Sequence, residues 1–451
     1  MTTWRSACVG PSGIGRIPAG ESVTRQVLVV TRDRVGPEMA GPAIRAVELA
    51  RTLSEENEVR LAAPFGEQVD KQIPFFRYDR SRASSLRAAL AGVEVVFSDP
   101  LPPAAARAIP DGRRRWIVDF YNPEPFEGLE TYRHAKGRLE RRALDVVRTD
   151  RLLFAARIGS AFVCANERQR DMWLGFLAAE RRVASARYDA DPEGWRLVGV
   201  VPFGVPTEPP RPGPALLRGK VFPETAKILL WSGGLWDWLD PLTVLRSLAL
   251  LREQDDAWRC AFIGTVRPFG GEHFTMFERT KRLAGELGLA EAGAVKFIDW
   301  VPYEERGTPL LEADVAVCAH FRTMETRFAV RTRLSDAVWA GLPIVNTDGD
   351  HWSELVRARG LGEVVPPEQP DQLAAAAARV GANGRSHYAE ALGAMADRLR
   401  WPVVAQPLHR LVEEADELPP AASVSLGARL IGARHAGAQR AHRIRAWLGR
   451  G

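Results

Sequence analysis

Short apolar runs alternate with longer amphipathic runs in two separate stretches of this chain, one on each side of a proline-rich segment. The first stretch opens with a strand-like run at 26–31, and residues 41–57 predict the helix that follows, because their apolar side chains recur at helical spacing. Parallel strands need long crossover connections, which helices usually supply. The sequence therefore predicts an α/β protein with parallel sheets covered by helices.

The same alternation continues through both stretches. In the first, further strands are predicted at 58–64, 93–99, 115–121 and 160–166, the last followed by a helix from Glu167. In the second, a run beginning at Lys227 is followed by strands at 258–265, 295–301, 313–319, 343–347 and 362–366, and by helices at 242–253, 273–287, 304–312, 332–340 and 370–380. Cys164, Cys260 and Cys318 lie in these apolar runs, so we expect buried, reduced thiols and a cytoplasmic protein.

Residues 201–212 contain five prolines, which fit neither a helix interior nor a central strand. This segment therefore predicts a linker between two α/β domains, with a cleft between them. The domain boundaries that we expect are an N-terminal extension (1–26), a first domain (27–207), a second domain (208–400), a crossover segment (401–420) and a tail helix (421–451). In open parallel sheets, ligands bind at the carboxyl ends of the strands, so we expect the functional residues in the loops that follow these ends.

The net charge of +5 is concentrated at the two ends of the chain. Residues 421–451 hold six arginines and no acidic residue, whereas 27–420 carry a net charge of −3. One face of the expected tail helix carries Leu426, Leu430, Ala433, Gly437, Ala441, Ile444 and Leu448. This pattern predicts peripheral contact with an anionic membrane, on its inner face; the alternatives are a helix that packs on a domain and a solvated or frayed end. No motif for nucleic-acid binding accompanies the charge.

Two loops have the glycines that a phosphate-binding backbone needs. Gly41 and Pro42 precede a helix that contains Arg45, and we expect this segment to bind a phosphate or the acceptor, the alternative being an ordinary strand-to-helix turn. Ser232, Gly233 and Gly234 follow the first strand of the second stretch and suit a diphosphate. Trp236 and Trp238, just beyond, either stack on a ring or cover the sheet.

An arginine-rich loop at 321–333 leads into a helix that ends in the sequence Ala-Gly-Leu-Pro at 340–343. Residues 336–345, Asp-Ala-Val-Trp-Ala-Gly-Leu-Pro-Ile-Val, resemble the E-A-M-A-x-G-x-P-V-V motif of family 4 of the retaining nucleotide-sugar glycosyltransferases. The resemblance covers about residues 27–415. It implies the GT-B architecture, in which two Rossmann-like domains face each other across a cleft, with the nucleotide sugar on the second domain and the acceptor on the first.

The resemblance also implies roles for individual residues. Asp336 replaces the glutamate that usually holds the donor ribose, and it keeps the two oxygens needed for hydroxyl groups. The family's other glutamate would fall on Phe328, so Glu325, three residues earlier, is the nearest carboxylate. The arginine and lysine that bind the diphosphate in this family are missing here: the segment after the Ser-Gly-Gly loop is LWDWLDPL. Arg331 and Arg333 are the nearest substitutes, since guanidinium groups bind phosphates in bidentate fashion; Arg45 is another.

Three further segments follow from the same comparison. Asp119, Tyr121 and Asn122 stand where the family often presents a histidine to the reacting sugar; the alternative is a turn capped at Asn122. Asp299 and Trp300 match the segment that reads the nucleobase. Asp350 and Glu354 match the segment beside the donor, although Glu354 equally suits the first turn of a helix.

The sequence thus predicts retaining transfer of a hexosyl group from a nucleoside diphosphate sugar to a hydroxyl of a glycan, lipid-linked or small-molecule acceptor. Catalysis would rest on Arg331, Arg333 and Asp119, without a metal or cofactor. Two alternatives stay open: a sugar-nucleotide epimerase of the same architecture, and an inactive sugar-nucleotide-binding protein, which the missing basic pair favours. A pyridoxal phosphate-dependent phosphorylase fits less well, because the chain is short and poor in lysine.

Overall fold

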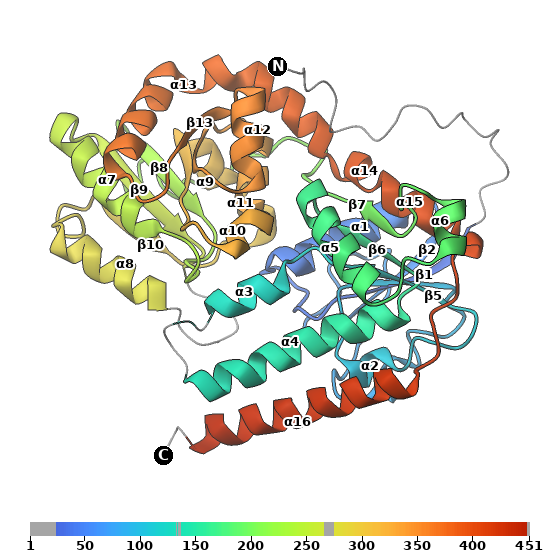
Figure 1. Ribbon diagram of the computed structural model, residues 1–451. Helices are drawn as coiled ribbons and strands as arrows, with labels where there is room; N and C mark the ends of the chain where they lie inside the picture. The colour runs from blue at the N-terminus through green and yellow to red at the C-terminus, as the bar shows by residue number, and fades with distance from the viewer. Residues whose placement is uncertain (1–23, 132, 134–136, 266–274, 449–451) are drawn as a thin grey trace.

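A computed structural model describes residues 24–131, 133, 137–265 and 275–448 and shows two parallel sheets, each in its own domain (Figure 1). The first sheet has the strand order β3-β2-β1-β4-β5-β6-β7 and the second the order β10-β9-β8-β11-β12-β13. The strands of the first sheet are β1 (Gln26–Val30), β2 (Glu58–Ala63), β3 (Phe75–Arg77), β4 (Val95–Ser98), β5 (Arg115–Asp119), β6 (Ala161–Cys164) and β7 (Val198–Val200). Those of the second are β8 (Lys227–Ser232), β9 (Trp258–Ile263), β10 (Val295–Ile298), β11 (Val315–Cys318), β12 (Ile344–Thr347) and β13 (Gly362–Val365).

Helices cover both faces of each sheet. The first domain contributes η1 (Ala83–Leu86), α1 (Gly41–Leu53), α2 (Pro103–Ala106), α3 (Glu124–Thr131), α4 (Arg138–Ile158), α5 (Glu167–Ala179) and α6 (Ser185–Ala190). The second contributes α7 (Pro241–Gln254), α8 (Thr275–Glu286), η2 (Tyr303–Glu305), α9 (Gly307–Glu312), α10 (Met324–Phe328), α11 (Thr332–Trp339), α12 (His351–Arg359) and α13 (Pro370–Leu399). The central strands are almost wholly buried, as expected where helices cover a parallel sheet on both sides.

The strand order of each sheet reverses beside its first strand. In the first domain β1 lies between β2 and β4, and in the second β8 lies between β9 and β11. Ligands of open α/β sheets bind at such reversal points, beyond the carboxyl ends of the strands. The loops after β1, β4 and β8 are therefore placed where a ligand would bind.

The chain returns to the first domain after α13. Val205 of the linker pairs with Arg400 through Val205 N–Leu399 O (2.7 Å) and Trp401 N–Val205 O (2.9 Å). The crossover segment forms α14 (Trp401–Val404), α15 (Gln406–Glu413) and η3 (Ala415–Glu417). Its Asp416 accepts a 2.8 Å hydrogen bond from buried Arg25, which also binds Glu94, so this segment is tied to the start of β1. The tail forms α16 (Leu426–Leu448), which lies alongside α4 (Figure 1).

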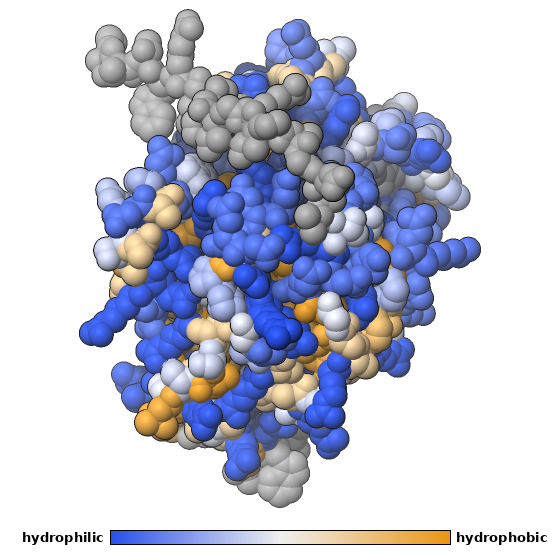
Figure 2. Space-filling view, turned by 90° about the vertical axis from the view of Figure 1, so that its right-hand side faces the viewer, coloured by the Kyte–Doolittle hydropathy of each residue, from blue (hydrophilic) through white to orange (hydrophobic). Residues whose placement is uncertain are grey.

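The tail is a helix, as predicted, and it packs on the first domain through the face opposite the apolar one. Ala428, Ile431 and His435 are buried, whereas Leu426 and Leu430 are mostly exposed. The side chain of Leu448 lies outside the described residues. Hydrophilic side chains dominate the face of the molecule in Figure 2, and hydrophobic ones form small groups in its lower half. Across the described residues, every helix is too short or too polar to cross a membrane.

Most predicted elements are present, with some differences at the edges. The helix predicted at 370–380 continues to Leu399, with a break at Gly384, where φ is +70°. Gly341 ends α11 with φ +60°, as its place after the last turn predicts. The three-residue strands β3 and β7 and the polar helix α4 were not predicted. Cys164, Cys260 and Cys318 are buried and reduced on β6, β9 and β11, as expected, and burial raises the pKa of Cys318 to about 11.

Candidate active site

The loops at the strand ends of the two domains face each other and are in direct contact. Tyr303 N donates a 2.9 Å hydrogen bond to Pro37 O across the cleft. Gln169 Nε2 donates both to Tyr121 O (2.9 Å) and to Phe328 O (2.8 Å), so one amide joins the two domains. Phe126 stacks on Phe328 with ring centroids 5.3 Å apart. The predicted donor and acceptor segments thus lie on the facing edges of the two domains.

The Ser-Gly-Gly loop after β8 brings its backbone close to neighbouring groups. Gly233 has φ +111°, and a Cβ there would lie 3.4 Å from Arg333 Nη2. Trp231 Nε1 donates a 3.1 Å hydrogen bond to Gly233 O, which fixes the peptide. Gly264, with φ +78°, packs on the other side, where a Cβ would lie 3.4 Å from Gly233 Cα. Glycine is the residue that adopts these backbone angles without strain, and its lack of a side chain lets Arg333 and the Gly264 backbone pack directly against the loop.

Arg333 extends from α11 to this glycine loop. Its Nη2 donates a 2.9 Å hydrogen bond to Gly234 O, and its guanidinium carbon lies 4.6 Å from the centroid of the Trp231 ring. Its Nη1 is buried without a hydrogen-bond partner, and none of the described carboxylates forms an ion pair with it. Burial and the nearby charge of Arg331 lower the pKa of Arg333 to about 10. A buried cation without a counter-ion beside a glycine loop is the arrangement that receives an anion.

Arg331 is instead neutralised within the protein. Its Nη1 and Nη2 bind the two carboxylate oxygens of Glu325 at 2.7 and 2.8 Å, and both side chains are buried. Its Nε lies 3.9 Å from Asp350 Oδ2. Although burial opposes the charged form, these carboxylates raise the pKa of Arg331 above its usual value. The predicted phosphate-binding role of Arg331 therefore competes with a complete bidentate pair.

Asp350 caps the helix that follows it. Its Oδ1 accepts from Ser353 N (2.7 Å) and Asn346 Nδ2 (2.9 Å), and His320 Nε2 lies 3.3 Å from Oδ2. Burial alone would raise the pKa of Asp350, but His320 and Arg331 hold it below its usual value. In the described parts of the chain, no three histidine, cysteine or acidic side chains form a group suited to a metal ion.

Asp336 lies one turn after Arg333 on α11, and Arg306 holds its carboxylate. The Arg306 Nε to Asp336 Oδ1 distance is 3.2 Å. Arg306 is itself held between rings, with its guanidinium carbon 3.6 Å from the Tyr303 centroid and 4.5 Å from that of Trp339. Burial raises the pKa of Asp336 in spite of this partner. Arg306, which the sequence analysis missed, thus fixes the orientation of Asp336, the residue predicted to bind the ribose.

The remaining predicted donor residues lie at the rim of the same cleft. Ser232 ends β8, and Asp299 and Trp300 follow β10, with Trp300 3.5 Å from where a Cβ on Gly264 would stand. Trp236 and Trp238 stack on each other with centroids 5.7 Å apart.

Glu354 is the outermost of the predicted donor residues and lies in the first turn of α12. It pairs with Arg168, which also donates to Arg327 O (3.2 Å) and Gly349 O (3.1 Å). Arg168 belongs to α5 of the first domain, so Glu354 takes part in a contact between the domains.

On the opposite wall, Arg45 and Asp119 form a buried pair. Arg45 Nε and Nη2 lie 2.6 and 3.2 Å from the Asp119 oxygens, and Nη1 donates to Pro202 O at 2.9 Å. Tyr121 covers the pair, with its ring centroid 4.9 Å from the Arg45 guanidinium carbon. A Cβ on Gly41 would lie 3.7 Å from the Tyr121 hydroxyl, so the phosphate loop predicted at Gly41 and Pro42 adjoins this group. Arg45 therefore joins α1, β5 and the linker.

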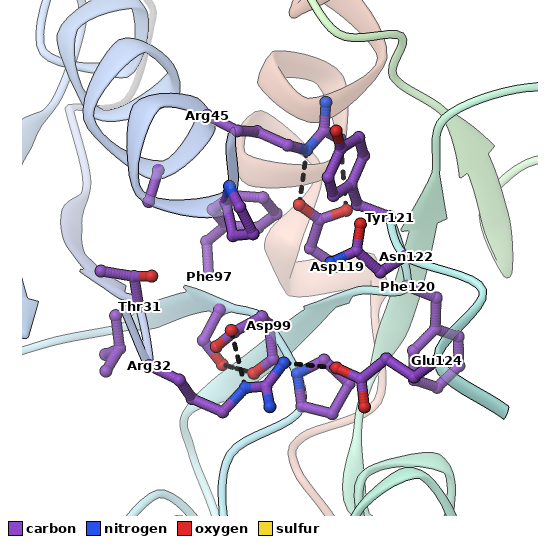
Figure 3. Close-up of a pocket in the computed structure, with 15 residues that line it drawn as sticks. Thr31, Arg32, Arg45, Phe97, Asp99, Asp119, Phe120, Tyr121, Asn122 and Glu124 are labelled. Carbon is purple, nitrogen blue, oxygen red and sulfur yellow. Dashed lines mark hydrogen bonds and ion pairs between the residues drawn. The ribbon is translucent and has the colours of Figure 1, made fainter. Parts of the chain in front are cut away.

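A second charged group, also missed by the sequence analysis, lines the same pocket as the Arg45–Asp119 pair (Figure 3). Arg32 follows β1 and binds Asp99 Oδ2 at 2.7 Å, and it also binds Glu124, which pairs with Arg151 of α4 as well. Asn122 lines the pocket between this group and the Arg45–Asp119 pair. The only sequence signal for this second group was the position of Arg32 and Asp99 at predicted strand ends.

These neighbouring carboxyls titrate differently. Burial raises the pKa of Asp99 to about 6, because Arg32 only partly offsets it and Asp33 and Glu124 add negative charge. Glu124 is equally buried, but Arg151 and Arg32 lower its pKa to about 2. Glu127, one turn further along α3, has a pKa raised to about 8 by burial and by Glu325 across the cleft. Moreover, Asp99 Oδ1 is buried without a partner, so it is available to accept a hydrogen bond from a ligand.

Comparison with known proteins agrees with this geometry. Residues 226–383, which include the glycine loop, Arg333 and Asp336, match the family model described as Glycosyl transferases group 1. No curated protein sequence matches the chain. Among solved structures, a sucrose-phosphate synthase from Thermosynechococcus elongatus is 14% identical with a TM-score of 0.60, covering 87% of this chain and 100% of its own.

Two further solved structures are similar over the same extent. HepE from Anabaena in complex with UDP-glucose is 12% identical, with a TM-score of 0.61, and covers 87% of this chain and 100% of its own. WaaG, a glycosyltransferase involved in lipopolysaccharide biosynthesis, is 13% identical, with a TM-score of 0.53, and covers 86% and 99%. This chain has the GT-B glycosyltransferase fold. The predicted α/β architecture of two Rossmann-like domains across a cleft is confirmed.

Proposed function

We propose that this protein transfers a hexosyl group from a nucleoside diphosphate sugar to a hydroxyl group of an acceptor, with retention at the anomeric carbon. The observation that carries the proposal is Arg333, which extends its Nη2 to the glycine loop at Gly233 and Gly234 and has a buried Nη1 without a hydrogen-bond partner. A diphosphate would neutralise this charge, whereas in its absence the buried cation is unfavourable. The match of residues 226–383 to a glycosyltransferase family model supports the same assignment.

Arg333 would act on the leaving group. When the bond between the anomeric carbon and the diphosphate oxygen breaks, the electron pair stays on that oxygen, and its negative charge grows. Arg333 and the backbone N–H of Gly234 would stabilise this charge, whereas the N–H of Gly233 already donates to Ile263 O (2.7 Å). The departing phosphate would take the proton of the acceptor hydroxyl, so the proposed mechanism uses no metal ion and no cofactor.

The nucleoside would lie along the second domain. Asp336, held by Arg306, would accept hydrogen bonds from the two ribose hydroxyls. Asp299 and Trp300 would adjoin the nucleobase at the end of β10. Glu325, whose carboxylate is bound by Arg331, would accept a hydroxyl of the donor sugar.

The acceptor would enter from the first domain, into the pocket of Figure 3. Arg32, Asp99, Glu124 and Arg151 together carry no net charge, and Asp99 Oδ1 is free to accept a hydrogen bond. A neutral group with both donor and acceptor sites suits an uncharged hydroxyl better than a phosphate. We therefore propose a glycan, lipid-linked or small-molecule acceptor that presents a neutral sugar hydroxyl, and a cytoplasmic site of action.

The test is incubation of the purified chain with a panel of nucleoside diphosphate sugars, starting from UDP-glucose, with measurement of nucleoside diphosphate release. We expect release with at least one donor, faster with neutral sugar acceptors, and loss of release in Arg333→Gln. Binding of a nucleoside diphosphate without release from any donor would support the inactive-protein alternative, since Arg331 and Arg45 are both already paired. Absence of both binding and release would reject the proposed function.

A further inference from the structure

The C-terminal helix α16 directs its large apolar side chains away from the protein. Leu426, Leu430 and Ile444 are 74%, 63% and 58% exposed, and the small residues Ala433 and Gly437 lie between them on the same face. Apolar side chains that recur at helical spacing normally mark the buried face of a helix. Here the pattern marks the outer face, which indicates a surface that contacts something other than this domain.

The opposite face of α16 is fixed to α4. Ala428, Ile431 and His435 are buried there. Arg434 Nε donates to Asp150 Oδ1 and Oδ2 at 2.9 and 3.0 Å, and Asp150 is fully buried. Nearer the C-terminus, His442 Nδ1 lies 3.2 Å from Glu140 Oε1. The helix therefore cannot rotate to bury its leucines without leaving a buried carboxylate unpaired, which is strongly unfavourable.

Positive charge surrounds the outward face. Arg429, Arg440 and Arg443 are exposed, and within the described residues none of them has an ion-pair partner. Residues 421–451 contain no acidic residue, whereas residues 27–420 carry a net charge of −3. Leu139, in the first turn of α4, is 65% exposed and lies near the Glu140–His442 contact, and Arg138 and Arg142 beside it are exposed too. The charge asymmetry would orient this side of the molecule toward an anionic surface.

We propose that the outward face of α16, with Leu426, Leu430 and Ile444 as its apolar residues and Arg429 and Arg440 as its basic ones, lies on the surface of an anionic phospholipid bilayer. The leucine and isoleucine side chains would enter the boundary between headgroups and acyl chains, while the guanidinium groups bind the lipid phosphates. The helix would lie in the plane of the membrane, because its ion pairs with α4 keep its axis along the domain surface. This inference does not depend on the proposed catalytic function.

The experiment is co-sedimentation of the full chain with vesicles of phosphatidylcholine and phosphatidylglycerol (3:1), and with vesicles of phosphatidylcholine alone. The test variant is Leu430→Ser with Ile444→Ser. The matched control is Val183→Ser with Val403→Ser, which changes two apolar side chains that are 44% and 50% exposed elsewhere on the first-domain side of the molecule. A charge variant, Arg429→Gln with Arg440→Gln, separates electrostatic from apolar binding. Thermal unfolding checks that each variant is folded.

We expect the wild-type chain and the control to sediment with the anionic vesicles and not with phosphatidylcholine alone. Apparent affinity should fall about tenfold or more in the Leu430 and Ile444 variant. The charge variant should bind more weakly, with a smaller dependence on salt. Three results would overturn the proposal: no sedimentation of the wild-type chain, equal binding by the apolar-face variant, or a dimer of the wild-type chain that this variant converts to a monomer, since the face would then bind a second copy.

Discussion

Replacement of Arg333 by methionine separates a ligand-binding cation from a structural one, because stability and binding should change in opposite directions. Methionine has a similar length and no charge. Burial lowers the pKa of Arg333 from 12.5 to about 10, which corresponds to roughly 3 kcal/mol of unfavourable free energy for its charged form. The hydrogen bond to Gly234 O offsets about 1 kcal/mol of this cost. We therefore expect the free energy of unfolding of Arg333→Met to be about 1–2 kcal/mol higher than that of the wild-type chain, so that the variant is more stable.

The same replacement should weaken binding of the nucleoside diphosphate. A hydrogen bond to a charged group contributes about 1.5–3 kcal/mol, so the dissociation constant should rise roughly 10- to 150-fold. Urea unfolding gives the first quantity and isothermal titration with the diphosphate gives the second. The matched control is Arg331→Met, which leaves Glu325 buried without its partner and should lower the free energy of unfolding by about 3–5 kcal/mol.

The reasoning about Arg333 fails if Arg333→Met destabilises the protein as much as Arg331→Met does and leaves diphosphate affinity unchanged. Arg333 would then only support the glycine loop, and its buried, unpartnered Nη1 would no longer be evidence for a diphosphate site. An increase in stability without any change in affinity would also contradict it, because the buried cation would then have no ligand.

Three further outcomes follow from the same contacts. Asp336→Ala should raise the dissociation constant for the nucleoside diphosphate about tenfold but not that for pyrophosphate, measured by titration calorimetry, and equal effects on both would exclude ribose binding. Burial raises the pKa of Asp99 to about 6, and the proposed function uses its ionised form to accept a hydrogen bond from the acceptor hydroxyl. The KM for the acceptor should therefore rise as the pH falls through 6. Initial rates measured between pH 5 and 8 should show this rise in the wild-type chain but not in Asp99→Asn. Arg434→Ala should lower the free energy of unfolding by about 1–3 kcal/mol in urea titration, since it leaves Asp150 unpaired, whereas Asp150→Asn combined with it should recover part of the loss.

The sequence predicted the architecture because hydrophobic periodicity records which side chains are buried. Central strands such as β1 and β8 are apolar on both faces, and the prolines at 201–212 mark the linker. The edge strands β3 and β7 were missed because each has only three residues. Helix α4 was missed because charged residues dominate its first turns, where it is only partly buried. The face of α16 that packs on the first domain is fixed by contacts with Asp150 and Glu140 of α4, which no periodicity reveals.

The sequence predicts candidate residues for the site but only some of the partners that these residues have in the structure. The glycine loop, Arg333 and Asp336 could be named, because the resemblance to a known motif fixes their places in the chain. The pairing of Arg331 with Glu325, and of Arg45 with Asp119, could not be predicted, since it depends on side-chain geometry between separate elements. Arg306 was missed for the same reason, and with it the group that orients Asp336.

The central claim is that Arg333 and the glycine loop after β8 bind the diphosphate of a nucleotide sugar. The most direct test is a crystal structure of the full chain with UDP, or with whichever nucleoside diphosphate binds best in the panel. The account predicts diphosphate oxygens within hydrogen-bond distance of Arg333 Nη1 and of the backbone N–H of Gly234, with the ribose at Asp336. A diphosphate bound elsewhere, with Nη1 still unpartnered, would contradict it.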